Sequence, residues 1–267
     1  MSLLDRYGPW AVIAGASEGT GRAYALQLAE HGFSLILIAR RQSPLDDLAA
    51  DIRAQFDVEV VTASIDLGLP DAHQRVIDAA GDREIGLYIS NAGADPNGAR
   101  FLDKDAEAWR SLVTRNVLTT MLCCHHFATL MRARRRGGLL LVNSFACYGG
   151  GQFMACYTGS KAFDLTFGES LWSELKPYGV DVLSLVMGMT DTPAFNALLA
   201  EKGLPSPAGI ASPDDVTAFA LANLANGPVQ NWAVPEAYPL GDGVGSAAQR
   251  RERIIMIDQR SSDVFGE

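Results

Sequence analysis

Long apolar runs and basic residues are both scarce in this sequence. No uninterrupted apolar run approaches the ~20 residues that a transmembrane helix needs, so we expect no membrane span. The opening stretch, Met1 to Arg6, lacks the basic-then-apolar order of a signal peptide. The 267-residue chain carries 22 basic and 31 acidic residues, for a net charge of -9. Because an acidic protein gains nothing from releasing the counterions of a phosphate backbone, we expect no nucleic-acid partner.

Cysteine and histidine are also sparse, with four residues of each. Cys123, Cys124, Cys147 and Cys156 show no metal-ligand spacing, so we expect no metal site. Free thiols without a leader sequence are typical of a reducing compartment, which predicts a cytoplasmic protein. Apolar residues make up 48% of the chain and charged residues 20%, and the length suits one large globular domain better than two.

Short apolar stretches alternate with stretches of helical periodicity along the chain. Continuous apolar runs such as Ser34 to Ala39 are typical of strands buried on both faces of a parallel sheet. Strands are predicted over 10–14, 34–39, 58–62, 85–90, 139–143, 180–186 and 231–235, and helices over 20–31, 43–56, 70–80, 106–134, 155–176 and 213–226. This alternation predicts an α/β fold, a single doubly wound (Rossmann) domain whose seven-stranded, mainly parallel sheet has helices on both faces.

Two stretches interrupt the alternation, and both are rich in glycine, proline and alanine. They cover residues 189–212 and 236–267. Long irregular segments in a compact domain are usually functional loops or tails. We therefore interpret 189–212 as a substrate lid and 236–267 as a C-terminal extension of a single domain that spans 1–267.

A glycine-rich turn stands where the first strand feeds the first helix. Gly15 permits a tight turn, and Gly19 and Gly21 let the backbone and the helix approach a phosphate closely. The spacing is G-x-x-x-G-x-G, not the G-x-G-x-x-G of the common dinucleotide fingerprint. The turn predicts a dinucleotide pyrophosphate site, and the alternative is a glycine turn with no ligand.

Arg40 follows the second predicted strand, where a doubly wound fold meets the adenine ribose. An acid there binds the 2′-hydroxyl, whereas an arginine accommodates a 2′-phosphate. Arg40 therefore favours NADP, although Glu18 in the glycine turn places a negative charge near the same phosphate. The alternative is a solvated surface arginine.

Other polar and small residues follow the later strands. Asp66 and Leu67 can hold the adenine edge, and the small residues from Asn91 to Gly93 let a cofactor pass. Asn116 lies inside a predicted helix. Because asparagine is a poor helix former, Asn116 is either a buried functional residue or a helix-surface residue.

Ser144, Tyr157 and Lys161 together supply a hydrogen-bond donor, a phenol and a cation. Tyr157 and Lys161 are spaced one helical turn apart on one face. A nearby ammonium favours the phenolate, and the phenol can then give a proton to a carbonyl oxygen or take one from an alcohol. Ser144 can hydrogen-bond the same oxygen. This set predicts hydride transfer between a bound cofactor and a C=O/CH–OH pair.

In order and spacing, these motifs resemble those of the short-chain dehydrogenases/reductases. The motifs are Gly15-x-x-x-Gly19-x-Gly21, Asp66, Asn91-Ala92-Gly93, Asn116, Ser144 and Tyr157-x-x-x-Lys161. The resemblance covers nearly the whole chain and implies a Rossmann-type domain, a nicotinamide cofactor and a catalytic tetrad of Asn116, Ser144, Tyr157 and Lys161. The stretch from Gly15 to Tyr24 looks most like members that reduce 3-ketoacyl chains or steroids.

The chain departs from the family pattern at two places. Ser90 stands where the family has a first asparagine before Asn91, and Met187 replaces the usual proline before Gly188. Thr192 keeps the spacing of the residue that binds the nicotinamide amide. The expected cofactor is NADP (NADPH), with NAD as the alternative, and the predicted cofactor-binding residues are Gly15, Ser17, Glu18, Gly19, Thr20, Gly21, Arg40, Asp66, Leu67, Asn91, Ala92, Gly93, Tyr157, Lys161, Gly188, Thr190 and Thr192.

The predicted substrate is a bulky apolar carbonyl or secondary alcohol, of aryl, 3-ketoacyl or steroid-like character. The residues expected around it are apolar or soft, and none is basic: Ala146, Cys147, Tyr148, Phe153, Met154, Met187, Met189 and Phe195. The alternative is that several of these are simply core residues.

Apolar side chains on more than one face of the 106–134 and 155–176 segments predict a homodimer or homotetramer. They are Phe127, Met131, Phe163, Phe167, Leu171 and Trp172. Two other functions remain open at this point. One is a catalytically silent nucleotide sensor or scaffold of the same fold. The other is an epimerase or dehydratase that uses the same tyrosine–lysine pair.

Overall fold

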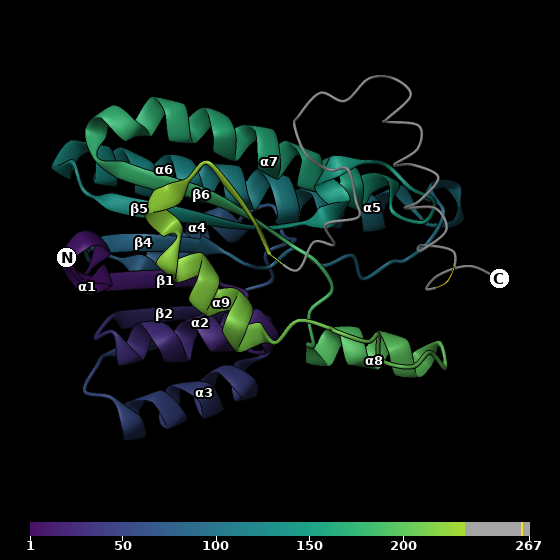
Figure 1. Ribbon diagram of the computed structural model, residues 1–267, viewed down its shortest axis with the longest axis horizontal. Coiled ribbons are helices and arrows are strands. Elements are labelled where there is room, and N and C mark those ends of the chain that lie inside the picture. The colour runs from purple at the N-terminus through teal and green to yellow at the C-terminus, as the bar shows by residue number, and fades with distance from the viewer. Residues whose placement is uncertain (233–262, 264–267) are drawn as a thin grey trace.

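A single sheet of seven parallel strands forms the centre of the protein (Figure 1). The computed structural model describes residues 1–232 and 263. The strands are β1 (Trp10–Ala14), β2 (Ser34–Ala39), β3 (Val60–Ser64), β4 (Ile85–Ser90), β5 (Gly137–Ser144), β6 (Val180–Met187) and β7 (Val229–Trp232). Their order is β3-β2-β1-β4-β5-β6-β7, and each neighbouring pair is parallel. The predicted doubly wound sheet is confirmed.

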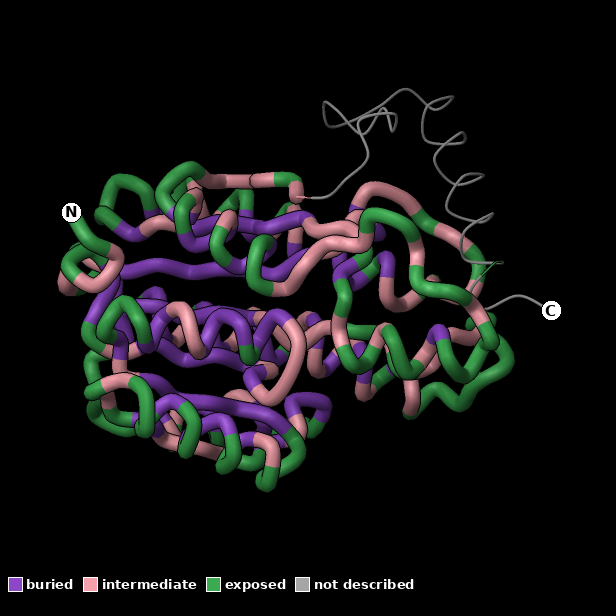
Figure 2. Tube along the Cα trace, turned by 60° about the horizontal axis from the view of Figure 1, so that its bottom comes forward, coloured by how far each residue is buried: buried purple, intermediate pink, exposed green. Residues whose placement is uncertain are grey.

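Helices cover both faces of this sheet, and the strands between them are buried (Figures 1 and 2). One face packs against α2 (Gly19–Glu30), α3 (Gln42–Gln55) and α9 (Pro213–Ala222), with the short α1 (Leu3–Tyr7) at its end. The other face packs against α4 (Ala72–Ala80), α6 (Thr120–Arg134) and α7 (Ala155–Leu175). Because successive strand residues point to opposite faces, Ile13 joins the first core and Val12 the second.

The parallel arrangement brings the carboxyl ends of the seven strands to one edge of the sheet. The register pairs Ala14 with both Ile38 and Ser90, and Ser144 with Met187. The loops after these strands therefore lie next to one another. In doubly wound folds the ligand binds at this edge, where the strand order reverses between β1 and β4.

The predicted helix over 106–134 is wrong in one respect, because it is interrupted. It consists of α5 (Ala106–Val113), a π-helical turn η2 (Thr114–Thr119) and α6. Asn116 lies in the π turn and is only 1% exposed. The alternative of a helix-surface asparagine is therefore wrong. Single π turns inside helices occur frequently at functional sites.

The segment 189–212 contains a helix that its Gly/Pro-rich composition concealed. Thr192 caps α8 (Pro193–Glu201) by accepting a hydrogen bond from the backbone N–H of Phe195, and Pro193 occupies the first turn. Thr190 and Ala211 form a β-bridge that ties the two ends of the segment together. In Figure 1, α8 projects beyond the edge of the sheet.

The last predicted strand is shifted toward the N-terminus, since β7 begins at Val229 rather than at residue 231. The predicted strand residues 233–235, and the predicted extension 236–267 apart from Asp263, lie outside the described residues. Within the described part of the chain, none of the helices has the length and apolar character of a membrane-spanning segment.

Candidate active site

Three glycines let the turn after β1 pack tightly against neighbouring loops. Gly15 has φ +93°, and a Cβ there would lie 2.8 Å from the backbone nitrogen of Ala92. A Cβ on Gly21 would lie 1.8 Å from the carbonyl oxygen of Gly15, and a Cβ on Gly19 would lie 2.9 Å from the Thr192 methyl carbon. Any side chain here would fill the space between backbone and helix. The turn therefore requires glycine for close approach.

The first turn of α2 has free hydrogen-bonding capacity where a pyrophosphate would sit. Its N-cap residue, Glu18, makes no side-chain capping bond. The first backbone N–H groups of a helix lack partners inside the helix, and the helix dipole makes this end positive. Together with the glycines, these groups fit the phosphates of a dinucleotide.

Two predicted cofactor residues hold this cradle in shape. The Asn91 amide nitrogen donates to the Gly15 carbonyl at 2.8 Å, and the Thr20 hydroxyl donates to the Asn91 amide oxygen at 2.7 Å. Their side chains thus tie the glycine turn to the end of β4. On the neighbouring loop, Asp66 accepts from the backbone N–H of Gly68 at 2.9 Å.

Two arginines follow β2, and sequence reasoning identified only one of them. Arg40 is exposed, and its backbone carbonyl accepts from the Ser64 hydroxyl at 2.8 Å. Arg41 pairs with the Glu18 carboxylate at 2.6 Å. The two consecutive arginines in the sequence did not indicate that Arg41 would pair with Glu18 and offset the negative charge of the glycine turn.

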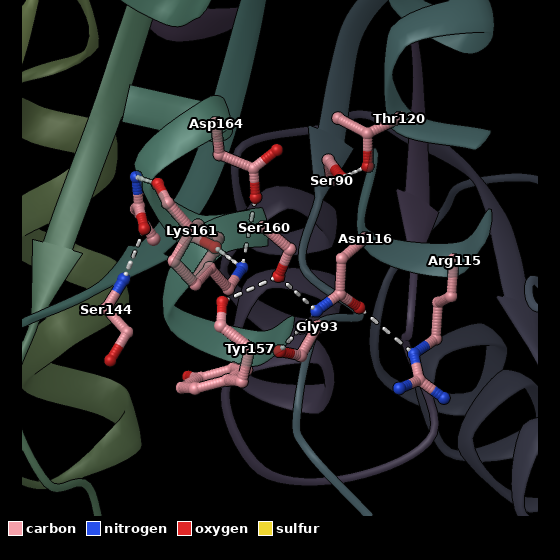
Figure 3. Close-up of polar contacts among 12 residues, drawn as sticks. Ser90, Gly93, Arg115, Asn116, Thr120, Ser144, Tyr157, Ser160, Lys161 and Asp164 are labelled. Atoms are coloured by element: carbon pink, nitrogen blue, oxygen red, sulfur yellow. Dashed lines mark hydrogen bonds and ion pairs between the residues drawn. The ribbon is translucent and has the colours of Figure 1, made fainter. Parts of the chain in front are cut away.

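The catalytic residues predicted from the sequence lie together, at the end of β5, within η2 and in the first two turns of α7 (Figure 3). Lys161 is 4% exposed, and its ammonium donates to the Val142 carbonyl at 2.9 Å. The same ammonium lies 3.3 Å from the Asp164 carboxylate. Gly93 leaves room for this arrangement, because a Cβ there would lie 2.5 Å from the lysine Nζ.

Asn116 is joined to the start of α7 through a serine. Its amide nitrogen donates to the Ser160 hydroxyl at 3.0 Å, and that hydroxyl donates to the Tyr157 carbonyl at 2.7 Å. Its amide oxygen accepts from the Arg115 guanidinium at 3.2 Å. The π turn therefore fixes the helical turn that carries Tyr157 and Lys161.

Ser144 is the last residue of β5. Its oxygen accepts from the Ala146 N–H at 3.2 Å, which leaves its own hydroxyl proton for another acceptor. The preceding residue, Asn143, donates to the Lys161 carbonyl at 3.1 Å and so joins β5 to α7. In Figure 3 the hydroxyls of Ser144 and Tyr157 lie on the same side of Lys161.

The loop after β6 is held by backbone bonds rather than by the proline that the family pattern has there. The Gly188 N–H donates to the Trp232 carbonyl at 3.1 Å, and the Asp191 N–H donates to the Ala211 carbonyl at 2.8 Å. Thr190 bonds the Gly188 carbonyl at 3.3 Å. These contacts hold the loop that places Thr192 next to Gly19 of the glycine turn.

The residues expected to line the substrate site differ in burial. Ala146 and Cys147 are buried, whereas Met189 is exposed. Burial raises the pKa of the Cys147 thiol to about 12, although the nearby Lys161 charge opposes the shift. The Cys147 thiol is therefore unreactive at neutral pH. Among the described residues all four cysteines are free thiols.

A cation lies beside the expected wall, which sequence reasoning missed. The guanidinium of Arg100 is 5.3 Å from the centre of the Phe153 ring. Phe153 itself has φ +63°, a conformation that non-glycine residues rarely adopt. The apolar wall predicted from the sequence thus has a basic residue at its border.

Comparison with known proteins agrees with this geometry. Residues 9–203 match the short chain dehydrogenase family. The chain is 33% identical over 204 residues to a very-long-chain 3-oxoacyl-CoA reductase of Podospora anserina, an alignment that covers 75% of this chain but only 60% of that relative. It is 30% identical over 195 residues to a 7beta-hydroxysteroid dehydrogenase of Collinsella aerofaciens, covering 73% of this chain and 74% of the relative.

Solved structures show the same fold. A short-chain dehydrogenase from Sphingobium yanoikuyae in complex with NADPH superposes with a TM-score of 0.76 at 28% identity, covering 84% of this chain and 87% of that one. The sequence match, the shared fold and the arrangement of Ser144, Tyr157 and Lys161 lead to one conclusion. The chain belongs to the short-chain dehydrogenase family.

Proposed function

We propose that this protein is an NADP-dependent oxidoreductase that interconverts a carbonyl and a secondary alcohol on a bulky apolar substrate. One observation carries the proposal. The buried ammonium of Lys161 lies one helical turn from the half-buried Tyr157, and Ser144 lies on the adjoining strand end. A nucleotide sensor or scaffold has no need of this combination of donor, phenol and cation.

In the reducing direction, Tyr157 gives its phenolic proton to the carbonyl oxygen of the substrate, and in the oxidising direction it takes that proton back. The positive charge of Lys161 stabilises the phenolate that remains. Ser144 donates a hydrogen bond to the same substrate oxygen and so stabilises negative charge that develops on it. A nicotinamide cofactor supplies or accepts the hydride.

The residues around the glycine turn fit such a cofactor. The uncapped first turn of α2 would hold the pyrophosphate, and Asp66 lies where the adenine edge would bind. Arg40 supports NADP over NAD because it stands where an acid would otherwise bind the ribose 2′-hydroxyl. The negative charge of Glu18 would disfavour a nearby 2′-phosphate, but Arg41 pairs with that carboxylate and offsets its charge.

The substrate class is supported by the side chains near Ser144 and by the relatives. Four half-buried apolar residues lie in this part of the chain: Phe153 and Met154 in the loop before α7, Met187 at the end of β6 and Phe195 in α8. We assign the segment 189–212, with α8 inside it, as a lid over this region. The two curated relatives are named for 3-oxoacyl-CoA and hydroxysteroid chemistry, both with large apolar bodies. The free thiols support a reducing compartment such as the cytoplasm.

The function is tested with purified protein, NADPH and a panel of ketones. Consumption of NADPH, followed by loss of nicotinamide fluorescence, is expected with aryl, long-chain or steroid ketones. The reverse reaction is tested with NADP and the matching alcohols. Binding of NADPH without consumption in the presence of any ketone or aldehyde would instead support a sensor.

A further inference from the structure

Asp164 is a buried carboxylate that sequence reasoning did not identify. It lies on α7 and is 4% exposed, the same fraction as Lys161. One carboxylate oxygen lies 3.3 Å from the lysine Nζ. The other oxygen, Oδ1, is buried and has no hydrogen-bond partner among the described residues. The ammonium of the candidate active site therefore has a buried counter-ion on its own helix (Figure 3).

Stability does not account for this pair. Burying two charges costs several kcal/mol per ion before their attraction is counted, and an apolar pair of similar volume is often as stable or more so. The unpartnered Oδ1 adds a further desolvation cost. A pair with these costs suggests a functional role for the acid.

We propose that Asp164 is a positioning residue that acts through Lys161 and sets the pH range in which Tyr157 exchanges its proton. The inference rests on the proposed function. Lys161 donates both to Asp164 and to the Val142 carbonyl, so its ammonium is held at a fixed point. The nearby carboxylate also offsets part of the positive charge that Tyr157 experiences.

The sign of the effect follows from the charges. Lys161 alone would favour the phenolate of Tyr157, whereas the Asp164 carboxylate disfavours it. Removing that negative charge, while keeping the lysine, should let Tyr157 release its proton at lower pH.

Neighbouring groups do not take over the role of Asp164. Burial raises the pKa of the thiols of Cys124 on α6 and Cys147 on η3 (Phe145–Tyr148), so both stay neutral. β5 has no titratable side chain, and the acid of β6, Asp181, is paired with Arg6. Among the described residues, Arg115 beside Asn116 and Asp95 in the loop after β4 also carry charge in this region, whereas Glu169 of α7 is exposed to solvent, which screens its charge.

The surroundings of the carboxyl group agree with this role. Burial raises the pKa of Asp164, and the charge and hydrogen bond of Lys161 oppose that shift. The carboxyl group thus depends on the lysine for its ionised form, and the lysine is positioned by the carboxylate in return.

The test compares Asp164→Asn, which removes the charge at nearly constant shape, with Asp164→Glu, which restores it. Asp164→Ala is the second charge-removing variant, in case the asparagine variant folds poorly. Glu169→Gln is the matched control, because it removes an exposed acid from the same helix. Two measurements are made on each: the pH profile of alcohol oxidation, and the near-ultraviolet phenolate titration of the cofactor-free protein, with the signal of Tyr157 isolated by subtracting a Tyr157→Phe background.

Asp164→Asn and Asp164→Ala should shift the acid limb of the oxidation profile and the Tyr157 titration to lower pH by about one unit or more. Asp164→Glu should keep both midpoints close to those of the unmodified protein, and Glu169→Gln should not shift them. An unchanged midpoint in both measurements, with only a uniform loss of rate or of folded protein, would overturn the proposal. The titration needs no turnover, so absence of activity in the unmodified protein would reject the proposed function and leave this inference to be decided by the titration.

Discussion

The guanidinium of Arg41 lies 2.6 Å from the Glu18 carboxylate and so joins the loop after β2 to the glycine turn. Both side chains are largely exposed, so the pair adds little to stability. Its effect is local. The pair offsets the negative charge of the turn. In the proposed function, this leaves Arg40 to bind the 2′-phosphate of NADP.

Arg40→Ala should therefore separate the two cofactors. A charge-assisted hydrogen bond contributes roughly 1.5–3 kcal/mol, or about 10–150-fold in affinity. We expect NADPH binding to weaken by about that factor and NADH binding to change little, as measured by fluorescence titration. Glu18→Gln is the comparison, and it should alter NADPH affinity only slightly because Arg41 already offsets the charge. Equal losses for both cofactors would show that Arg40 does not read the phosphate.

Tyr157→Phe should abolish turnover while the protein still binds cofactor. General acid–base catalysis contributes ~10²–10⁴-fold, so the rate should fall by at least that order. Steady-state rates and NADPH titration measure the two properties separately. Tyr178→Phe, at an exposed site beyond α7, is the control and should retain full activity. Activity of Tyr157→Phe within a few-fold of normal would mean that another residue moves the proton.

Gly93→Ala should impair catalysis. The new Cβ would lie 2.5 Å from the lysine Nζ, so the ammonium would have to leave the position at which Val142 and Asp164 hold it. Displacing a reacting group by about 1 Å can cost ~10²-fold in rate. Gly159→Ala on α7 meets no atom within 4 Å and should instead stabilise the helix by about 0.5–1 kcal/mol. Thermal unfolding and kcat together test both, and an unimpaired kcat in Gly93→Ala would contradict the assigned position of the ammonium.

Substrate size should govern kcat/KM. Aryl, long-chain or steroid-sized ketones should react much faster than short ketones, with ~1–3 kcal/mol at most for each added well-buried group. Steady-state kinetics over a graded series of ketones measures this. A preference for sugars or 2-keto acids would contradict the apolar site. Arg100, the basic residue beside Phe153, would then be the candidate for binding the polar group of the substrate.

The protein should form a homodimer or homotetramer. Phe127 and Met131, expected to contribute to an interface, are instead buried in the core. Leu118 on η2 and Leu130 on α6 are apolar side chains that are 44% and 45% exposed. Light scattering at micromolar concentration should give a multiple of the 28.6 kDa chain mass. Leu118→Asp should reduce the assembly, and a monomeric mass for the unmodified protein would contradict the prediction.

The sequence by itself determined the features that depend on local spacing. The strand and helix periodicity predicted the doubly wound sheet, because buried strands are continuously apolar whatever their neighbours are. The one-turn spacing of Tyr157 and Lys161 likewise placed both on one face of a helix before any contact was known. The glycine turn after β1 was predicted on the same kind of local signal.

Only the tertiary structure decided which charges meet and which side chains are buried. The pairing of Arg41 with Glu18 joins residues from separate loops, and the burial of Asp164 depends on how α7 packs beside the sheet. The sequence also did not predict the π turn at Asn116, because it lies inside a stretch with helical periodicity. It did not predict the helix α8, because that helix lies inside a Gly/Pro-rich segment. The physical reason is common to all of these. Burial and charge pairing depend on neighbours distant in the sequence, which no local pattern specifies.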